Sequence, residues 1–433
     1  MDKPTPIPAF PPRTGLAGAM ALALALPAMP ALAADLLIVA EAPAAEGRDW
    51  TGPRVGIELP AGARGSLTYT TSTPTTYRFS ETGLAPGLFA GYDWQFRPRW
   101  VGGVEAGWSK PNLDFAPLPQ FGPMLEVGGQ LSLTGRLGYL TGDNSLAYGR
   151  LGFARTAIDV AEGFDDTASK TLNAAVIGAG IESFVNDRVS ARVEMRYLHG
   201  LDTLRTVDQV SFEMDELQVA AGISYHWQQH RQAEALPPSE AVWTGFHAGL
   251  TLGYAPGAMD NRVAGDLYGP YAAGRAAGGL QLGYDWQVNQ NWVVGAQYEF
   301  IRLDQKFRDP GADTIATSGP TVFATLKSSQ AISLRFGRLI QPETLLYGSV
   351  GRSQMKLAAS PDFYPLDGGG NQSLGGWQFG LGMETAFSRH LSMRVEGVYT
   401  DARDDLVTTN AQNEQVRLSP SVFSGRIGLS YRF

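Results

Sequence analysis

The sequence contains no cysteine, so it has no disulfide bridge, no thiol nucleophile and no thiolate metal site. Its five histidines show no metal-binding spacing such as HExxH, and neither a GxSxG motif nor a phosphate-binding loop is present. The common catalytic and cofactor-binding motifs are therefore missing. We predict that the protein is not an enzyme and that it holds no cofactor and no metal.

Long apolar runs are also missing beyond the N-terminal region, and the mean hydropathy is −0.12. A membrane-spanning helix needs roughly 20 apolar residues, so the sequence excludes a bundle of membrane helices. The net charge of −8 gives the chain no overall basic character. Nucleic-acid-binding proteins depend on a basic surface, so we predict no nucleic-acid partner.

The one apolar run lies at the N-terminus. Lys3 and Arg13 precede the apolar stretch 15–26, and Ala31 and Ala33 are small residues placed for cleavage after position 33. A basic start, a short apolar core and a small-residue cleavage site are typical of a secretory signal peptide. We predict that residues 1–33 form such a peptide and that a Sec-type route exports the chain. The alternative, a membrane anchor, needs a longer apolar run.

The remainder of the chain is present in two copies. The repeated blocks are Trp50–Gly52 and Trp243–Gly245, Gly91–Gln95 and Gly283–Gln287, Trp100-Val101 and Trp292-Val293, Tyr148-Gly149 and Tyr347-Gly348, Arg192–Glu194 and Arg394–Glu396, and Gly222–Trp227 and Gly428–Phe433. The offset between copies drifts from 193 residues at the start to 206 at the end, as small loop insertions would produce. We predict an N-terminal linker at 34–48, a first unit at 49–227, a polar linker at 228–241 and a second unit at 242–433.

Apolar and polar residues alternate with period two in several segments, among them 188–199 and 213–227, and this pattern predicts β-strands. The strands expected in the first copy are 51–60, 84–96, 99–108, 126–140, 145–158, 171–184, 188–199 and 213–227. The expected short turns are 96–99, 141–144 and 185–188, and in the second copy 288–291, 341–344 and 387–390. The expected long polar loops of the first copy are 61–83, 109–125, 159–170 and 200–212.

Short turns on one side and long loops on the other are the arrangement of outer-membrane β-barrels, in which the long loops lie outside the cell. The predicted fold is all-β, an antiparallel transmembrane β-barrel in two tandem eight-strand units. One sixteen-strand barrel is the alternative. The 14-residue linker at 228–241, much longer than the short turns, favours two separate barrels.

A soluble β-sandwich or a lipocalin-like barrel would also show alternation. Aromatic residues, however, gather at strand ends on the apolar faces, as in the interfacial girdle of a membrane protein. In the first copy these are Trp94, Phe96, Trp100, Trp108, Tyr197, Tyr225 and Trp227. Their position favours a barrel in a membrane.

The opposite faces of the strands carry charge. The candidate lumen residues are Asp93, Glu105, Arg136, Glu182, Arg192 and Glu194 in the first copy, and Asp285, Glu299, Arg335, Glu384, Arg394 and Glu396 in the second. The interior of an eight-strand barrel is just wide enough for side chains to fill it. We predict that these residues pair with one another in the lumen. The alternative is an ion-conducting path.

The ordered blocks Trp-Thr-Gly, Gly-Tyr-Asp-Trp-Gln, Trp-Val-Gly-Gly-Val-Glu and Gly-Arg-Leu-Gly-Tyr, with the terminal Tyr-Arg-Phe, carry a family likeness. The chain resembles the small outer-membrane β-barrel proteins of alphaproteobacteria, which are related to opacity proteins and to the OmpA membrane domain. The likeness covers Trp50–Trp227 and Trp243–Phe433, two units where family members usually have one. It implies a bacterial outer-membrane location. It also implies that Tyr431 and Phe433 form an assembly signal for the barrel insertion machinery.

Two classes of function follow. The first is a structural or surface-interaction barrel with a plugged lumen and long external loops. The second is a porin that passes small solutes. In either case we expect contact with outer-membrane lipid, lipopolysaccharide and the insertion machinery, and the sequence names no extracellular ligand. His199 near Asp202 is the one acid–base candidate. The acidic segments 165–166 and 401–405 match no calcium-loop pattern and are expected to be solvated.

Overall fold

The computed structural model describes residues 46–70, 76–116, 123–160, 170–205, 211–227, 232–309, 321–364 and 370–433. The predicted signal peptide, most of the predicted N-terminal linker and the acidic pair at 165–166 lie outside these residues. The regular structure within them is β-strand, and no helix there is long and apolar enough to cross a membrane.

The first copy forms a closed ring of eight antiparallel strands within the described residues. In order around the ring they are β2 (Gly52–Thr70), β4 (Gly87–Arg97), β5 (Trp100–Ser109), β7 (Leu125–Gly142), β8 (Ser145–Val160), β9 (Lys170–Phe184), β10 (Val189–Gly200) and β12 (Ser211–His226). The last strand pairs with the first through 16 partners, from Ser211–Thr70 to His226–Arg54. The ring therefore closes on itself.

The second copy forms an equivalent ring. Its strands are β14 (Gly245–Val263), β15 (Asp266–Gln287), β16 (Trp292–Asp309), β17 (Thr321–Gln341), β18 (Thr344–Ala359), β19 (Gly370–Ala386), β20 (Leu391–Ala402) and β22 (Gln415–Arg432). β22 pairs with β14 from His247–Arg432 to Val263–Val416. The two predicted eight-strand units are thus present. The edge of β12 pairs with β2 of its own copy and not with β14 of the second copy.

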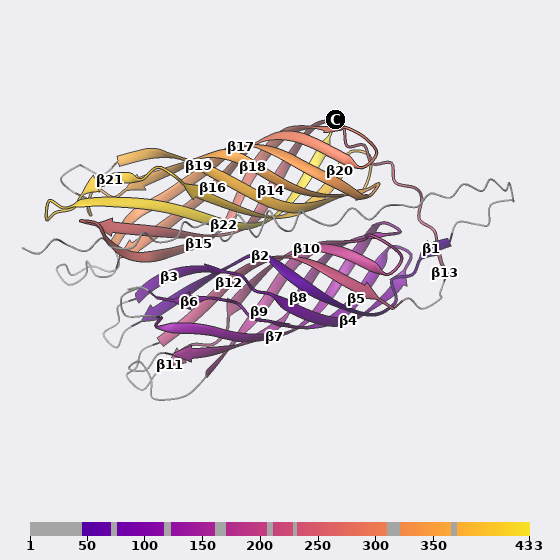
Figure 1. Ribbon diagram of the computed structural model, residues 1–433, viewed down its shortest axis with the longest axis horizontal. Coiled ribbons are helices and arrows are strands. Elements are labelled where there is room, and N and C mark those ends of the chain that lie inside the picture. Colours follow the sequence, from indigo (N-terminus) through magenta and orange to yellow (C-terminus); the bar gives the residue numbers. More distant parts are fainter. Residues whose placement is uncertain are drawn as a thin grey trace, which may run out of the picture.

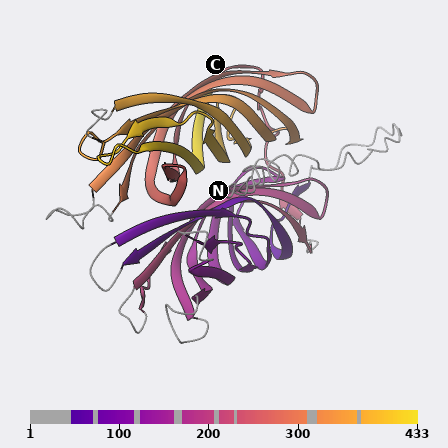
Figure 2. The same ribbon diagram turned by 60° about the vertical axis from the view of Figure 1, so that its left-hand side comes forward.

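The two barrels lie side by side (Figure 1), and Figure 2 shows the same arrangement from a second direction. Among the described residues a single backbone bridge joins the two rings, between Phe79 and Tyr271. The ends with longer connections, taken as extracellular, lie on the left in Figure 1. The short turns and the inter-barrel linker lie at the other end.

The prediction of a long polar loop at 61–83 is wrong. β2 continues to Thr70, and β3 (Thr76–Gly83) returns along it to form a hairpin that extends the barrel wall. Leu67 and Phe79 point inward and are buried, so the period-two pattern does continue through this segment. Serine and threonine residues between them made it resemble a loop. The short strands β6 (Asp114–Phe115), β11 (Leu204–Arg205) and β21 (Leu406–Thr409) also lie in connections.

The two linkers pair with each other at the periplasmic end. β1 (Glu46–Arg48) and β13 (Gln232–Glu234) form a separate two-stranded antiparallel sheet. The Arg48 guanidinium donates to Asn144 Oδ1 at 2.7 Å and to the Asp187 carbonyl oxygen at 2.6 Å, both in periplasmic turns of the first barrel. The linker sheet is therefore attached to the first barrel.

Outward apolar residues bury one face of each barrel against the other. Val193, Leu217 and Val219 of the first barrel cluster with residues of β19, β20 and β22, and all three are nearly inaccessible to solvent. The partners in the second barrel are Leu381, Met383, Val395, Tyr399 and Phe423. Strands equivalent in the repeat thus meet at the interface, and these outward residues contact protein instead of lipid.

Polar contacts join the barrels at both ends of this apolar interface. At the extracellular end, the buried Arg64 guanidinium donates to the carbonyl oxygens of Pro256 (3.3 Å) and Ser421 (3.1 Å). At the periplasmic end, the hydroxyls of Thr141 and Thr385 lie 2.7 Å apart. Hydrogen bonds of this kind have strict geometry, so they fix the orientation of one barrel relative to the other.

Candidate functional site: the two barrel lumens

The strands place charged side chains inside each barrel because every second residue points to the lumen. In the first barrel, Asp93 on β4 lies between two arginines. Arg54 Nε and Arg136 Nε each donate to its carboxylate at 2.8 Å. Arg136 Nη1 then reaches Glu182 on β9 at 2.6 Å. One chain of charges therefore crosses the lumen, and its members are buried.

Glu105 is the most connected residue of the first lumen. Its carboxylate lies 2.6 Å from Arg54 Nη1, 2.7 Å from Arg150 Nη1 and 2.8 Å from Arg192 Nη1. Arg192 also stacks on the ring of Phe89, with its Cζ 3.6 Å from the ring centroid. The three guanidinium groups converge from β2, β8 and β10, so Glu105 links three separate strands.

Two further carboxylates complete this network. Glu194 lies 3.0 Å from Arg150 Nη2 and accepts a hydrogen bond from the Tyr148 hydroxyl. Glu58 lies 2.7 Å from Arg192 Nη2 and 3.0 Å from Arg196 Nη2. All six predicted lumen residues of the first copy thus lie in one connected cluster. A buried charge is tolerated when it is paired with an opposite charge, and each of these groups has such a partner, although Arg150 makes its ion pairs to Glu105 and Glu194 without a hydrogen bond.

The second lumen repeats the layout with longer separations. Asp285 lies 3.6 Å from Arg335 Nε and 2.9 Å from Arg432 Nη2. Arg335 Nη2 donates to Glu384 at 2.7 Å, as Arg136 does to Glu182 in the first copy. The Tyr347 hydroxyl donates to Glu396 at 2.7 Å.

At the centre of the second lumen Arg394 is less tightly paired, although Arg426 Nη1 donates to Glu299 at 2.5 Å. Arg394 Nη2 lies 3.8 Å from Glu299 and 3.4 Å from Glu396. Arg394 Nη1 donates to Gln297, which occupies the repeat position of Glu105. The structure brings all six predicted residues of this copy together, but with fewer short ion pairs than in the first barrel.

Several lumen residues were missed by sequence reasoning. They are Arg54, Glu58, Arg150, Arg196 and Glu216 in the first barrel, and His247, Arg426 and Arg432 in the second. Each lies in phase with the inward residues of its strand, so strict period-two counting would have found it.

A tryptophan fills the periplasmic end of each lumen. Trp50 and Trp243 are each 2% exposed, and each begins the repeated Trp-Thr-Gly block. Trp50 Nε1 donates to the Asp143 carbonyl oxygen at 3.0 Å, and Trp243 Nε1 donates to that of Pro342 at 2.9 Å. Both acceptors lie in the same short turn of the repeat. The indole rings pack on aliphatic and aromatic neighbours below the charged layer.

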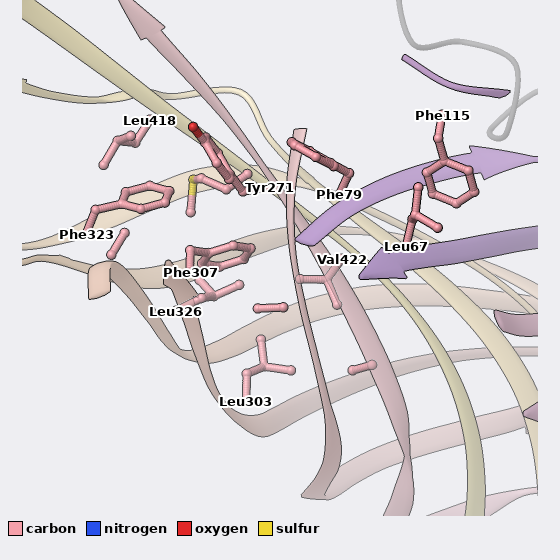
Figure 3. Close-up of a cluster of buried hydrophobic side chains, with 14 of the residues drawn as sticks. Leu67, Phe79, Phe115, Tyr271, Leu303, Phe307, Phe323, Leu326, Leu418 and Val422 are labelled. Carbon is pink, nitrogen blue, oxygen red and sulfur yellow. The ribbon is translucent and has the colours of Figure 1, made fainter. Parts of the chain in front are cut away.

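Apolar side chains fill the extracellular end of each lumen, and the two sets meet between the barrels. Figure 3 shows Leu67, Phe79 and Phe115 of the first barrel beside Tyr271 and Phe323 of the second. The rings of Phe79 and Tyr271 are stacked with centroids 6.2 Å apart. The ring centroids of Tyr271 and Phe323 are 5.3 Å apart. Each lumen therefore has an apolar layer at either end of its charged centre.

The remaining candidates lie outside the lumens. His199 Nδ1 lies 2.9 Å from Asp215 Oδ1, and Asp202 accepts hydrogen bonds from Asn173. The β10–β12 register places Asp215 beside the histidine, so Asp215 is the carboxylate that contacts His199. In the acidic segment 401–405, Asp404 accepts a hydrogen bond from the Gly375 amide.

The predicted assembly residues end β22 on the outer surface. Tyr431 is 50% exposed and Phe433 is 74% exposed. Their rings contact each other edge to face, with centroids 5.2 Å apart. The Phe433 amide donates to the Phe246 carbonyl oxygen on β14 at 2.9 Å, so the C-terminus is held at the seam that closes the second barrel.

Two relatives are outer-membrane proteins of alphaproteobacteria. The chain is 28% identical over 217 residues to the 31 kDa outer-membrane immunogenic protein of Brucella melitensis, a match that covers 46% of this chain and 87% of the relative. It is 32% identical over 145 residues to the 22 kDa outer membrane protein of Rhizobium leguminosarum bv. viciae, covering 33% of this chain and 65% of the relative.

Solved structures of bacterial barrels also match. Neisserial surface protein A matches 41% of this chain and 98% of its own, with 18% identity and a TM-score of 0.25. A Pseudomonas aeruginosa FadL homologue matches 88% of this chain and 90% of its own, with 11% identity and a TM-score of 0.28.

The family comparison covers almost the whole chain. The model of the outer membrane protein beta-barrel domain matches twice, over residues 21–226 and 231–433. The two matches correspond to the two repeated units, and the relatives agree with a location in the bacterial outer membrane. The chain therefore belongs to the outer membrane protein beta-barrel domain family, as a tandem pair of its barrels.

Proposed function

We propose that this protein is a non-conducting, non-enzymatic platform of the outer membrane, which holds the extracellular connections of two barrels in a fixed arrangement. The observation that carries this proposal is the filling of both lumens. A buried tryptophan closes the periplasmic end, paired charges fill the centre and an apolar layer fills the extracellular end.

Opening such a lumen would be costly. A solute path through the first barrel requires Glu105 to separate from at least some of its three arginines, which themselves come from different strands. Removing one partner of a buried ion pair costs about 3–5 kcal/mol, because the other charge is left uncompensated. The network therefore supports a lumen that stays closed.

The contacts between the barrels support a surface-interaction role. Arg64 and the Phe79–Tyr271 stack join the extracellular ends, so these ends of the two barrels form a common base. Functional residues are often carried by loops that a rigid scaffold positions. We infer that the ligand-binding surface of the protein includes extracellular connections of both barrels.

A porin is the second candidate, and the looser network of the second barrel favours it. Arg394 approaches Glu299 only to 3.8 Å, and Arg335 approaches Asp285 only to 3.6 Å. Ion pairs at such separations are easier to rearrange than the short pairs of the first lumen. Any conduction would then pass through the second barrel.

Planar-bilayer recording of the purified full-length protein tests the proposal. We expect no conductance steps from the wild type, because each lumen is closed at both ends. Trp50→Ala and Trp243→Ala each remove the tryptophan at the periplasmic end of one lumen. Recording them beside the wild type shows whether opening that end alone allows conduction through the first or the second barrel. Regular conductance steps from the wild type would refute the closed platform. Their loss on tightening the second lumen with Gln297→Glu would assign conduction to that barrel.

A further inference from the structure

The outer face of β16 changes character abruptly along its length. Its outward residues are aromatic or apolar from Trp292 to Phe300, as expected for a surface in contact with lipid. The next outward residues towards the extracellular end are Arg302, Asp304, Lys306 and Arg308, and Arg302 Nε is paired with Asp304 Oδ2 at 2.5 Å. The apolar band on this strand therefore ends in charged residues, among which Lys306 and Arg308 are exposed cations.

A polar row continues across the neighbouring strands. Arg302 and Lys356 are both cross-strand partners of Ser328 on β17. One step nearer the membrane centre, the Tyr298 hydroxyl donates to Gln330 Oε1 at 3.1 Å. Gln330 Nε2 in turn donates to Gln354 Oε1 at 2.8 Å. These side chains form an ordered surface on β16, β17 and β18.

Arg352 has an apolar neighbour on each adjacent strand. Its cross-strand partners are Ile332 and Trp377, and its Cζ lies 4.9 Å from the Trp377 ring centroid. Within the described part of the chain, no carboxylate lies within ion-pair distance of Arg352 or Lys356. Both cations are exposed, so their charge is available to a ligand.

The first copy shows that the barrel wall does not require this chemistry. At the repeat positions of Gln330, Arg352 and Lys356 the first copy has Leu131, Phe153 and Ala157. Leu131 is 61% exposed and Phe153 is 65% exposed, in the same kind of outward position. Strands of this fold therefore carry apolar residues at these three positions, whereas the repeat positions of Arg302 and Gln354 hold Lys110 and Arg155 in the first copy. Gln330, Arg352 and Lys356 thus need an explanation other than the fold.

We propose that the outer face of β16–β18, through Gln330, Arg352, Gln354 and Lys356, binds the phosphorylated headgroup of an outer-leaflet glycolipid, lipopolysaccharide. Guanidinium groups bind phosphate oxygens through charge-assisted hydrogen bonds, which are among the strongest in proteins. The acyl chains lie on the exposed apolar residues immediately below, Ile332, Leu334 and Val350. Apart from these residues, the inference requires only that the protein lies in the outer membrane. It does not depend on whether the lumens conduct.

An exchange between the two copies provides the test. The variant Gln330→Leu/Arg352→Phe/Lys356→Ala carries the residues of the first copy, which the same barrel wall accommodates there. A control variant, Lys110→Ala/Arg155→Ala, removes two exposed cations from the extracellular part of the first barrel. Each full-length protein is titrated in detergent with diphosphorylated lipid A, and binding is followed as a rise in melting temperature.

We expect lipid A to raise the melting temperature of the wild type and of the control. Binding to the exchange variant should be weaker by roughly tenfold or more, a difference of about 1.4 kcal/mol. Arg352→Gln alone, which keeps a polar side chain, should weaken binding in the same direction and guards against a folding defect. Equal affinity of the exchange variant and the wild type would overturn the proposal. So would equal stabilisation by dephosphorylated lipid A, phosphatidylglycerol or inorganic phosphate.

Discussion

Arg54 and His226 stand directly opposite each other across the strand pair that closes the first barrel. Arg54 donates to Asp93 and His226 contacts Glu182, at 2.8 and 3.1 Å. The second barrel has the same seam with the two residue types exchanged, His247 on the first strand and Arg432 on the last. Each seam thus places one arginine and one histidine beside two carboxylates. The two barrels differ in which closing strand carries the arginine and which carries the histidine.

This relationship predicts the outcome of a double exchange. Arg54→His/His226→Arg recreates in the first barrel the order found in the second. We expect its melting temperature to stay near that of the wild type. His226→Arg alone places a second guanidinium group directly opposite Arg54 and should be less stable. The coupling measured in this double-mutant cycle should be stabilising, and simple additivity of the two single changes would argue against a shared site.

The arginines at the lumen centres are expected to be structural. Replacing Arg192 by Leu leaves Glu58 and Glu105 each with one partner fewer, and Arg394→Leu does the same to Glu299 and Glu396. We expect each change to cost roughly 3–5 kcal/mol, because buried carboxylates lose compensation. The cost would appear as a lower melting temperature of the heat-modifiable band on unboiled gels. Unchanged melting together with altered conductance would place these residues in a channel instead.

Period-two patterning was enough to predict the eight strands of each copy and the phase of Asp93, Arg136 and Glu182. It did not reveal that Val193 and Leu217 face the other barrel. Lipid and a packed protein surface are both apolar, so the sequence gives no signal that separates them. The hydrogen bonds from Arg64 to Pro256 and Ser421 likewise depend on how the two barrels dock, and the local pattern of residues does not encode this docking.

Glu81 is expected to make the stability of the folded protein depend on pH. It lies on β3, in the extracellular extension of the first barrel. Burial raises its pKa from 4.5 to about 7, Asp260 and Asp114 act in the same direction, and Arg64 opposes them. The folded state therefore binds this proton more tightly than the unfolded state does. The stabilisation is complete below pH 4.5 and is lost as the pH rises to about 7.

The replacement Glu81→Gln should remove this contribution. We expect the melting temperature of the wild type to fall between pH 4.5 and 7 more steeply than that of the variant. Glu126→Gln, at an exposed position on β7, is the matched control and should keep the wild-type slope. Parallel curves for all three proteins would show that Glu81 does not couple to folding.

The C-terminal aromatic residue is predicted to act in assembly. Phe433 is 74% exposed on the outer surface, so its loss would remove little burial energy from the folded barrel. Deleting it should block insertion in cells and leave the chain in the periplasm, yet still permit refolding into detergent. Trp227→Ala changes the residue that follows the last strand of the first barrel and should insert normally. Normal surface levels without Phe433 would make it an ordinary residue of the aromatic girdle.

Engineered disulfides across the two closing seams test most directly that the copies form separate rings, and the absence of native cysteine makes the result clear. Ile57 pairs with Ile223, and Leu250 pairs with Leu429 at the equivalent position of the second barrel. Cross-strand partners lie within the distance that a disulfide spans. The account predicts that Ile57→Cys/Ile223→Cys and Leu250→Cys/Leu429→Cys each cross-link in the folded protein. It also predicts that Ile223→Cys/Leu250→Cys and Ile57→Cys/Leu429→Cys do not. Cross-linking of the last two pairs, with loss of the first two, would show one sixteen-strand barrel and contradict the account.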